Sequence, residues 1–141
     1  MPVRKANAVW NGDLFKGNGT MEFGSGAFKG NYSFGSRFEE AKGTNPEELI
    51  GAAHSGCFSM AFAGALGANG FKPEKVQTEA KVTVEKVGDG FKITMVELST
   101  EARVPDIDND KFQTLAEDAK KNCPVSQALT GVEIKLKAKL V

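Results

Sequence analysis

Two cysteines and a few charged side chains are the residues of this chain whose types and spacing could do chemistry. Cys57 and Cys123 lie far apart, without the CxxC spacing of a compact redox or zinc motif. Because the chain has only one histidine, His54, a single subunit cannot assemble a four-ligand zinc site without carboxylates. We expect no metal and no bound cofactor, and the two thiols are either a redox pair or two packed side chains.

The reactivity of Cys57 depends on what surrounds it. It lies between Gly56 and Phe58 in a stretch without formal charge, and burial among apolar groups raises the pKa of a thiol. A reactive thiolate there needs a cation or hydrogen-bond donors to offset the loss of water. Arg37 precedes this stretch in SRFEE, and its guanidinium stays protonated while offering a planar fork to sulfur or oxygen. We therefore nominate Arg37 as the partner of the thiolate.

A carboxylate from the motif NPEEL could hold this guanidinium. At about 100° per residue, Glu47 lies roughly 80° around a helix from Cys57, whereas Glu48 lies about 180° away. Glu47 is thus the candidate partner of Arg37, and Glu48 belongs to the helix cap. Ten residues at about 1.5 Å each still separate Glu47 from Cys57 by about 15 Å. Either Arg37 spans that gap, or an antiparallel second copy brings its own Glu47. We hypothesise the latter, a two-fold homodimer with composite sites.

Less specific interpretations remain open for each of these residues. A lone cysteine in an apolar helix is usually inert packing, and an ion pair between Arg37 and Glu47 at the surface is worth about 0–1 kcal/mol. His54 could act as a base three positions before the first cysteine, but a helical histidine in such surroundings is more often packed and hydrogen-bonded. Cys123 precedes Pro124 at an expected helix start, where free N–H groups favour a thiolate. It could equally be a simple cap.

The elements that position these residues predict an α+β fold in one domain over residues 1–141. Residues 6–34 mix aromatic and β-branched residues with glycines, which is typical of short antiparallel strands and turns. A helix of about residues 46–66 follows, with Asn45 as its cap and glycines after its end.

The second half of the chain predicts a hairpin, a helix and a last strand. Residues 80–87 and 91–104 alternate apolar and polar side chains around a Gly-Asp-Gly turn. Residues 106–122 have the pattern of an amphipathic helix, and a short helical turn follows Cys123. Residues 132–141 alternate as a half-buried strand does. The apolar face of the amphipathic helix consists of Phe112, Leu115 and Ala119.

Charge and patterning exclude several classes of protein. The 18 basic and 18 acidic side chains cancel, so no long-range field gathers nucleic acid. The N-terminus has no apolar segment typical of a signal peptide, and we expect a cytoplasmic protein. Residues 49–71 carry no charge, but Gly, Ala, Ser, Asn and His dilute their hydrophobicity, which favours a buried helix over a membrane span. In a reducing compartment a transient catalytic disulfide is more plausible than a permanent one.

Three segments together resemble the osmotically inducible protein C family, relatives of the organic hydroperoxide resistance proteins. They are AVWNGDLFKGNG, GTNPEELIGAAHSGCFSMAF and NCPVSQAL, and the resemblance extends over nearly the whole chain. It implies antiparallel sheets packed around a long central helix in an intertwined homodimer with two interfacial sites. It also implies a peroxidase that reduces organic hydroperoxides preferentially and hydrogen peroxide less well.

The same resemblance implies a role for each candidate residue. Cys57 would be the peroxidatic thiol, Cys123 the resolving thiol, Arg37 the activating cation and Glu47 its carboxylate partner. In the implied cycle the first thiolate attacks the hydroperoxide, the second captures the sulfenic acid as a disulfide, and an external dithiol resets the pair. A lipoyl-type dithiol is the candidate reductant. The alternative is a redox sensor or stress-induced binding protein that uses the same thiol without turnover.

Overall fold

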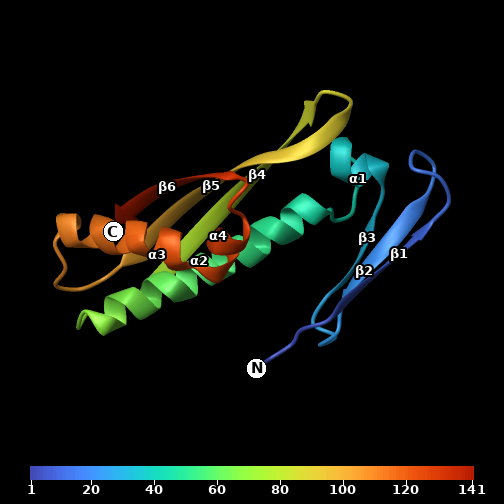
Figure 1. Ribbon diagram of the computed structural model, residues 1–141. Coiled ribbons are helices and arrows are strands. Elements are labelled where there is room, and N and C mark those ends of the chain that lie inside the picture. Colours follow the sequence, from blue (N-terminus) through green and yellow to red (C-terminus); the bar gives the residue numbers. More distant parts are fainter. The chain divides into compact units, whose positions relative to one another are not determined.

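The computed structural model describes residues 1–141, which form two compact units, Met1–Leu49 and Ile50–Val141 (Figure 1). Each unit has its own three-stranded sheet. The boundary falls in the first turn of one long helix, α2 (Pro46–Ala68), whose predicted extent is confirmed. The expectation of a single domain over residues 1–141 stays a prediction.

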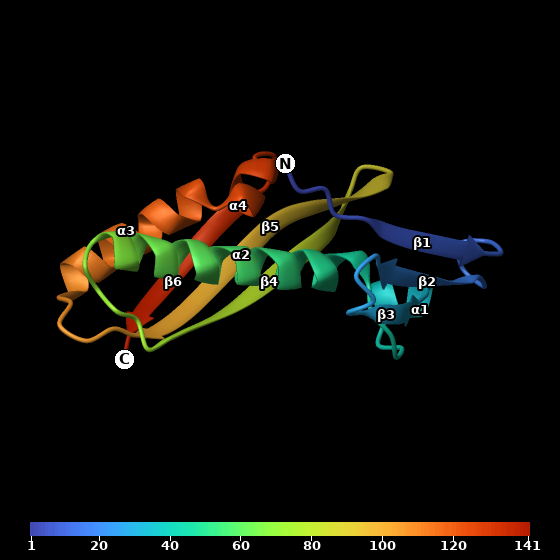
Figure 2. The same cartoon turned by 90° about the horizontal axis from the view of Figure 1, so that it is seen from below.

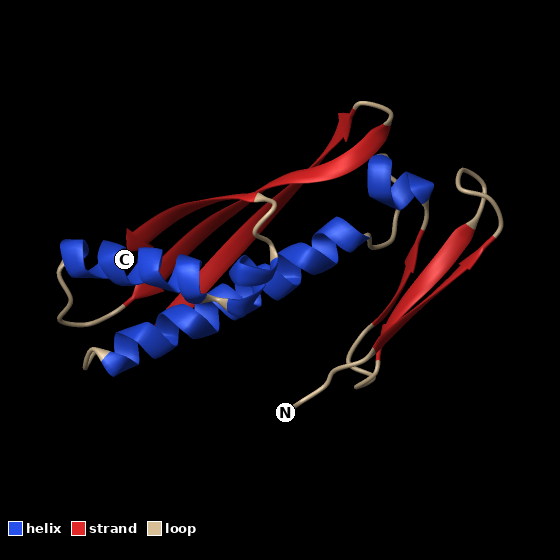
Figure 3. Ribbon diagram, viewed as in Figure 1, coloured by secondary structure: helices blue, strands red, loops and turns tan.

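The first unit is an antiparallel meander, as its sequence predicts (Figure 3). Its strands, in sheet order, are β1 (Ala6–Asn11), β2 (Asn18–Phe23) and β3 (Lys29–Tyr32). The prediction of strands and turns is wrong at its end, because residues from Phe34 form the short helix α1 (Phe34–Phe38).

A capping box made of two serines explains this helix. The Ser33 hydroxyl accepts from the Ser36 N–H at 3.1 Å, and the Ser36 hydroxyl accepts from the Ser33 N–H at 2.9 Å. Both N–H groups at the helix start are thereby satisfied. The usual sequence signature of a capping box has Glu or Gln in the third helical position, so Ser36 at this position does not predict a helix start. The box places Arg37 in the last turn of α1.

The second unit contains the predicted hairpin. Strands β4 (Lys75–Val87) and β5 (Gly90–Arg103) pair around a two-residue turn in which Gly88 adopts a left-handed φ of 61°. β4 begins at Lys75 rather than at residue 80. Figure 2 shows the turn end of this hairpin running past the third strand, β6 (Glu133–Leu140), which pairs only with Met95–Ala102 of β5.

The pairing of β6 corrects the expectation of purely antiparallel sheets, since β6 runs parallel to β5. Along the chain, β5 is followed by the helices α3 (Asn109–Asn122) and α4 (Pro124–Ala128), and then by β6. A crossover of this length carries the chain back to the end where β5 began, which a parallel pair requires and a tight turn cannot provide. The other three strand pairs are antiparallel.

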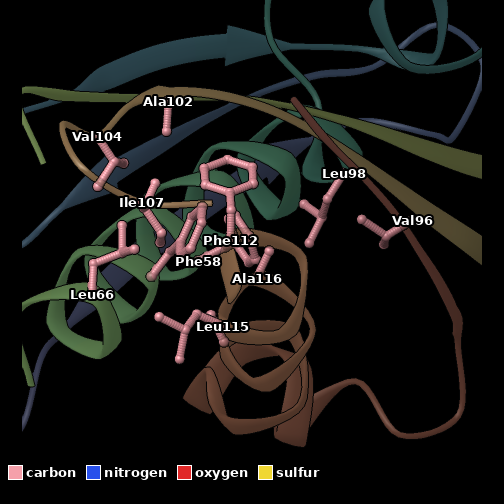
Figure 4. Close-up of a cluster of buried hydrophobic side chains, with 12 residues drawn as sticks. Phe58, Leu66, Val96, Leu98, Ala102, Val104, Ile107, Phe112, Leu115 and Ala116 are labelled. Atoms are coloured by element: carbon pink, nitrogen blue, oxygen red, sulfur yellow. The ribbon is translucent and has the colours of Figure 1, made fainter. Parts of the chain in front are cut away.

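The core of the second unit lies between one face of its sheet and the helices α2 and α3. Alternate residues of β5 are buried while their neighbours point to water. The predicted apolar face of α3 is confirmed. The ring centroids of Phe62 and Phe112 lie 5.2 Å apart. Figure 4 shows this cluster. Its buried members are Phe58, Phe62, Leu66, Val96, Leu98, Ala102, Val104, Ile107, Phe112, Leu115, Ala116 and Ala119.

The helix α2 has two different faces. By length and composition it could cross a membrane, yet Phe58, Phe62 and Leu66 are fully buried in this core, as the sequence predicts for a buried helix. Only 28% of its most apolar stretch is buried within the chain. After the first turn, which carries the exposed Glu48, the exposed residues of α2 have no charge; they are Ala52, Ala53, Gly56, Met60, Gly64, Gly67 and Ala68.

The packing of Phe62 provides a test of this core. Phe62→Ala should lower the free energy of unfolding by about 3–5 kcal/mol, because it removes a fully buried ring that contacts Phe58 and Phe112. Urea denaturation at one protein concentration, with thiols reduced, measures this change. Val87→Ala, at a half-exposed hairpin position, should change it by no more than about 0.5 kcal/mol. Equal effects of the two substitutions would contradict the described core.

Candidate active site

The two cysteines meet in the second unit. The Sγ atoms of Cys57, in the middle of α2, and Cys123, at the start of α4, lie 2.8 Å apart, and both thiols are free. A disulfide bond is about 2.0 Å long, so oxidation could join them after a small movement. Cys123 is fully buried, whereas Cys57 is partly exposed. The two thiols lie close enough to form a redox pair, and Cys57 is the more exposed residue of the two.

A break between two helices positions Cys123. Its N–H donates to the Ala119 carbonyl at 2.9 Å and closes α3, and the next residue, Pro124, opens α4. The residue before a proline is driven from helical to extended geometry, and Cys123 has φ −56° and ψ 125°. Because the chain turns at this residue, its side chain is presented to α2 instead of continuing around α3.

Hydrogen bonds favour the charged form of Cys123. Burial by itself raises the pKa of this thiol, but the hydrogen bond shared with Cys57, the N–H groups of Ser126 and Val125, and the Ser126 hydroxyl together lower it below the ordinary value. This agrees with the expectation that free N–H groups at a helix start stabilise a thiolate there.

The surroundings of Cys57 act in the opposite direction. Burial first, and then the hydrogen bond and charge repulsion with Cys123, raise the pKa of the Cys57 thiol, and the Val125 N–H offsets only part of this. No lysine or arginine of Ile50–Val141 contributes to lowering it. This unit alone therefore favours the negative charge on Cys123 over Cys57.

The first unit joins the other two predicted residues. Arg37, at the end of α1, donates through Nε to both carboxylate oxygens of Glu47 at 3.1 and 3.2 Å, and through Nη2 to Oε1 at 2.8 Å. The Glu47 side chain is only 8% exposed and the Arg37 side chain 37%. This two-point pairing confirms the predicted partners. It leaves the N–H groups of Nη1 for another anion.

A polar bridge fixes the two helix ends that carry this ion pair. Asn45 donates to the Ser36 carbonyl at 3.0 Å, and its side-chain oxygen caps α2 by accepting from the Glu48 N–H at 2.7 Å. The Ser36 hydroxyl also donates to the Thr44 carbonyl at 2.7 Å. The backbone N–H of Glu48 thus takes part in the helix cap, while its carboxylate accepts from the Thr44 hydroxyl at 3.2 Å.

An apolar cavity of about 240 Å³ adjoins Arg37 in the first unit. This cavity was not predicted from the sequence. The sequence does contain a signal for it, because Phe34 and Phe38 are four positions apart on either side of Arg37 and therefore share one face of a helix. In the structure their ring centroids lie 5.0 Å apart, and the Arg37 guanidinium carbon lies 5.1 Å from the centroid of the Phe38 ring. The cavity is lined by Trp10, Leu14, Tyr32, Ser33, Phe34, Arg37 and Phe38.

His54 is a packed, hydrogen-bonded residue, which was the more common outcome expected for such a histidine. Its Nε2 lies 2.7 Å from the Ser126 hydroxyl oxygen, and both residues are buried. The sequence reasoning missed Ser126, although the third position after a helix-starting Cys123 is where capping partners occur. No group of three or more His, Cys, Asp and Glu side chains is placed to hold a metal ion.

The burial of His54 predicts a pH dependence of stability. Burial lowers the pKa of this imidazole in the folded state, so below about pH 6.5 the unfolded chain binds more protons and stability falls as pH falls. His54→Gln should remove this contribution, at most about 1.4 kcal/mol per pH unit. Urea denaturation at about pH 7 and pH 5.5 measures it. Identical losses in parent and variant would contradict a neutral, buried His54.

The most similar sequences include a peroxiredoxin and a hydroperoxide resistance protein. Residues 39–137 match the profile of the OsmC-like protein family. The chain is 49% identical over 127 residues to Peroxiredoxin OsmC of Escherichia coli, with 89% of each chain covered. It is 36% identical over 90 residues to the organic hydroperoxide resistance protein of Xanthomonas axonopodis pv. citri, covering 63% of this chain and 61% of that one.

Solved structures share the fold. The organic hydroperoxide resistance protein OhrB of Bacillus subtilis superimposes with a TM-score of 0.72 at 25% identity, covering 96% of this chain and 98% of that chain. An organic hydroperoxide resistance protein OsmC from Legionella pneumophila gives a TM-score of 0.75 at 23% identity, with 99% of each chain covered. The profile match and the 49% identity to Peroxiredoxin OsmC establish that the chain belongs to the OsmC-like protein family.

Proposed function

We propose that the protein is a cysteine-based peroxidase that reduces organic hydroperoxides, and hydrogen peroxide less well, with Cys57 as the peroxidatic and Cys123 as the resolving thiol. The observation that carries this proposal is the 2.8 Å separation of the two sulfurs, of which only that of Cys57 is partly exposed. The names of the peroxiredoxin and hydroperoxide resistance relatives support it.

The proposed reaction has three steps. The Cys57 thiolate attacks the distal peroxide oxygen, the S–O bond forms as the O–O bond breaks, and the alkoxide takes a proton and leaves as alcohol. Cys123 then attacks the sulfenic sulfur and forms the disulfide while hydroxide leaves as water. An external dithiol, proposed to be of the lipoyl type, is oxidised as it reduces this disulfide. A reducing compartment such as the cytoplasm suits such a transient bond.

Arg37 is proposed to supply the charge that Cys57 lacks. The pKa of the Cys57 thiol is raised by burial, and a nearby cation is the direct way to lower it. Glu47 holds the guanidinium through Nε and Nη2, so the orientation of Arg37 is set before any substrate binds. The unused Nη1 can then bind the thiolate or the departing peroxide oxygen.

The cavity beside Arg37 supports a preference for organic hydroperoxides. Its lining is largely aromatic and aliphatic, with the guanidinium as its one charged group. The alkyl group of a hydroperoxide gains free energy by leaving water for such a surface, whereas hydrogen peroxide has no alkyl group to bury. About 240 Å³ accommodates a small aryl or alkyl chain.

We also propose an intertwined two-fold homodimer with composite sites. Beyond its first turn, the exposed residues of α2 are only Gly, Ala and Met, and small residues allow a second helix to approach closely and cover this face. Glu47 and Cys57 are ten residues apart on α2, about 15 Å along its axis. An antiparallel α2 of a second copy would bring the Arg37–Glu47 pair of that copy toward Cys57.

Turnover of cumene hydroperoxide with dihydrolipoamide tests the peroxidase proposal. The parent should turn over many times per site, and Cys57→Ser should lose this turnover because the attacking sulfur is gone. Cys123→Ser should consume about one equivalent per site and then stall, since its sulfenic acid has no partner. Thr114→Ala, on the exposed face of α3, serves as the control with parent activity.

Two results would contradict this assignment. Unchanged turnover in Cys57→Ser would remove that thiol from the reaction. A parent that is oxidised once and never recycles with the dithiol present would instead support the redox-sensor alternative.

Mixing two inactive variants tests the composite site. Arg37→Met lacks the cation and Cys57→Ser lacks the nucleophile, but their heterodimer should contain one complete site and regain about half of the parent activity. The variants carry different tags, are refolded together, and the doubly tagged species is purified before assay. Arg37→Met mixed with Glu47→Gln should stay inactive, because each site then lacks one of the paired residues. Sedimentation should give about twice the chain mass of 15.0 kDa. An inactive doubly tagged first mixture would refute composite sites.

A further inference from the structure

A buried hydrogen-bonded chain leads from α2 to Cys123. His54 is fully buried and Ser126 is 6% exposed, and Nε2 of the imidazole lies 2.7 Å from the serine oxygen. Ser126 is the third residue of the helix that Cys123 opens, the position whose side chain and N–H face the cap residue, and both groups lower the pKa of the Cys123 thiol. The proposed peroxidase steps leave His54 without a role. Because Ser126 lies between His54 and the Cys123 sulfur, His54 can act on this sulfur only through Ser126.

The unpaired nitrogen of His54 fixes the direction of this chain. Nδ1 is buried without a hydrogen-bond partner. A proton on Nδ1 would be a buried orphan donor, which is rarer in folded proteins than an acceptor lacking a partner. The proton therefore belongs on Nε2, which donates to the Ser126 oxygen. The single O–H of Ser126 is then free to donate to Cys123, so both hydrogen bonds point toward this sulfur.

The exposure of the two sulfurs decides which one a reductant attacks. Cys57 is partly exposed and Cys123 is fully buried, so the thiolate of an external dithiol attacks Cys57. A new S–S bond forms to Cys57 while the Cys57–Cys123 bond breaks and its electron pair goes to Cys123. The second thiol of the reductant then displaces Cys57, and the two protons of the reductant end on the two cysteines. A leaving thiolate departs faster when it is stabilised.

We propose that His54 and Ser126 are positioning residues that make Cys123 the leaving thiolate when an external dithiol reduces the Cys57–Cys123 disulfide. This inference rests on the proposed peroxidase cycle and assigns a residue to its recycling step. The titratable side chains that adjoin Cys123 are Cys57 from α2 and, through Ser126, His54. Removing either donor should weaken the same interaction at the same sulfur.

Two measurements on His54 and Ser126 variants test the proposal. In a Cys57→Ala background, the ultraviolet absorbance of the Cys123 thiolate is followed against pH. In the background with both cysteines, stopped-flow records the reduction of the preformed disulfide by dithiothreitol. His54→Leu and Ser126→Ala should each raise the titration midpoint by about one pH unit and slow the reduction about threefold. The double variant should do no more than Ser126→Ala alone.

Conservative variants separate positioning from packing. His54→Gln keeps an N–H near the place of Nε2 and should stay close to the parent in both measurements. His54→Asn is too short to reach Ser126 and should behave like His54→Leu, which it replaces if the leucine variant does not fold. Parent values in Ser126→Ala, or equal values in His54→Gln and His54→Asn, would overturn the proposal. Because the titration uses no hydroperoxide, it decides on His54 even if turnover refutes the peroxidase function.

Discussion

The contact between a sulfur in the middle of one helix and a sulfur at the start of another is the interaction on which the chemistry of this chain depends. Pro124 ends the helical path of α3, and this break presents Cys123 to α2. The core residues of α3 hold the break against the sheet, and the bond between His54 and Ser126 ties α4 to α2 beside it. The distance between the sulfurs exceeds the length of a disulfide bond by less than about 1 Å. Removing any of these contacts would therefore displace a sulfur that is placed for disulfide formation.

The two units differ in the charge that they stabilise. Residues 50–141 stabilise charge on Cys123 and oppose it on Cys57, which suits a resolving thiol but not a nucleophile at rest. Residues 1–49 hold a guanidinium clamped by a carboxylate, which is the cation that the proposed nucleophile requires. A cation clamped in advance costs no reorientation during the reaction. In the proposed dimer, Cys57 would become reactive only where a site is complete, which would protect an otherwise open sulfur from indiscriminate oxidation.

Sequence reasoning predicted the features that depend on residue type and helical angle. The pairing of Arg37 with Glu47 rather than Glu48 follows from about 100° per residue, and the hairpin follows from alternation around Gly88. It failed where the deciding information is not periodic. Alternation in residues 133–140 reports which face is buried but not the direction of pairing, so the parallel β6 was missed. The serine capping box of α1 and the partner Ser126 each depend on one hydroxyl in three dimensions, which composition does not reveal.

A buried histidine with one unpaired nitrogen is a poor choice for stability alone. Leaving Nδ1 without a partner costs about 1–3 kcal/mol, and an apolar side chain of similar volume would fill the same place between α2 and α4 without that cost. Local departures from good packing and hydrogen bonding are concentrated where function requires them. Here the cost is offset if the other nitrogen supports a thiolate, because a donor directed at a buried sulfur through Ser126 does what no hydrocarbon can. The one proton of the neutral imidazole then lies on Nε2, and Nδ1 is left as an acceptor that no donor reaches.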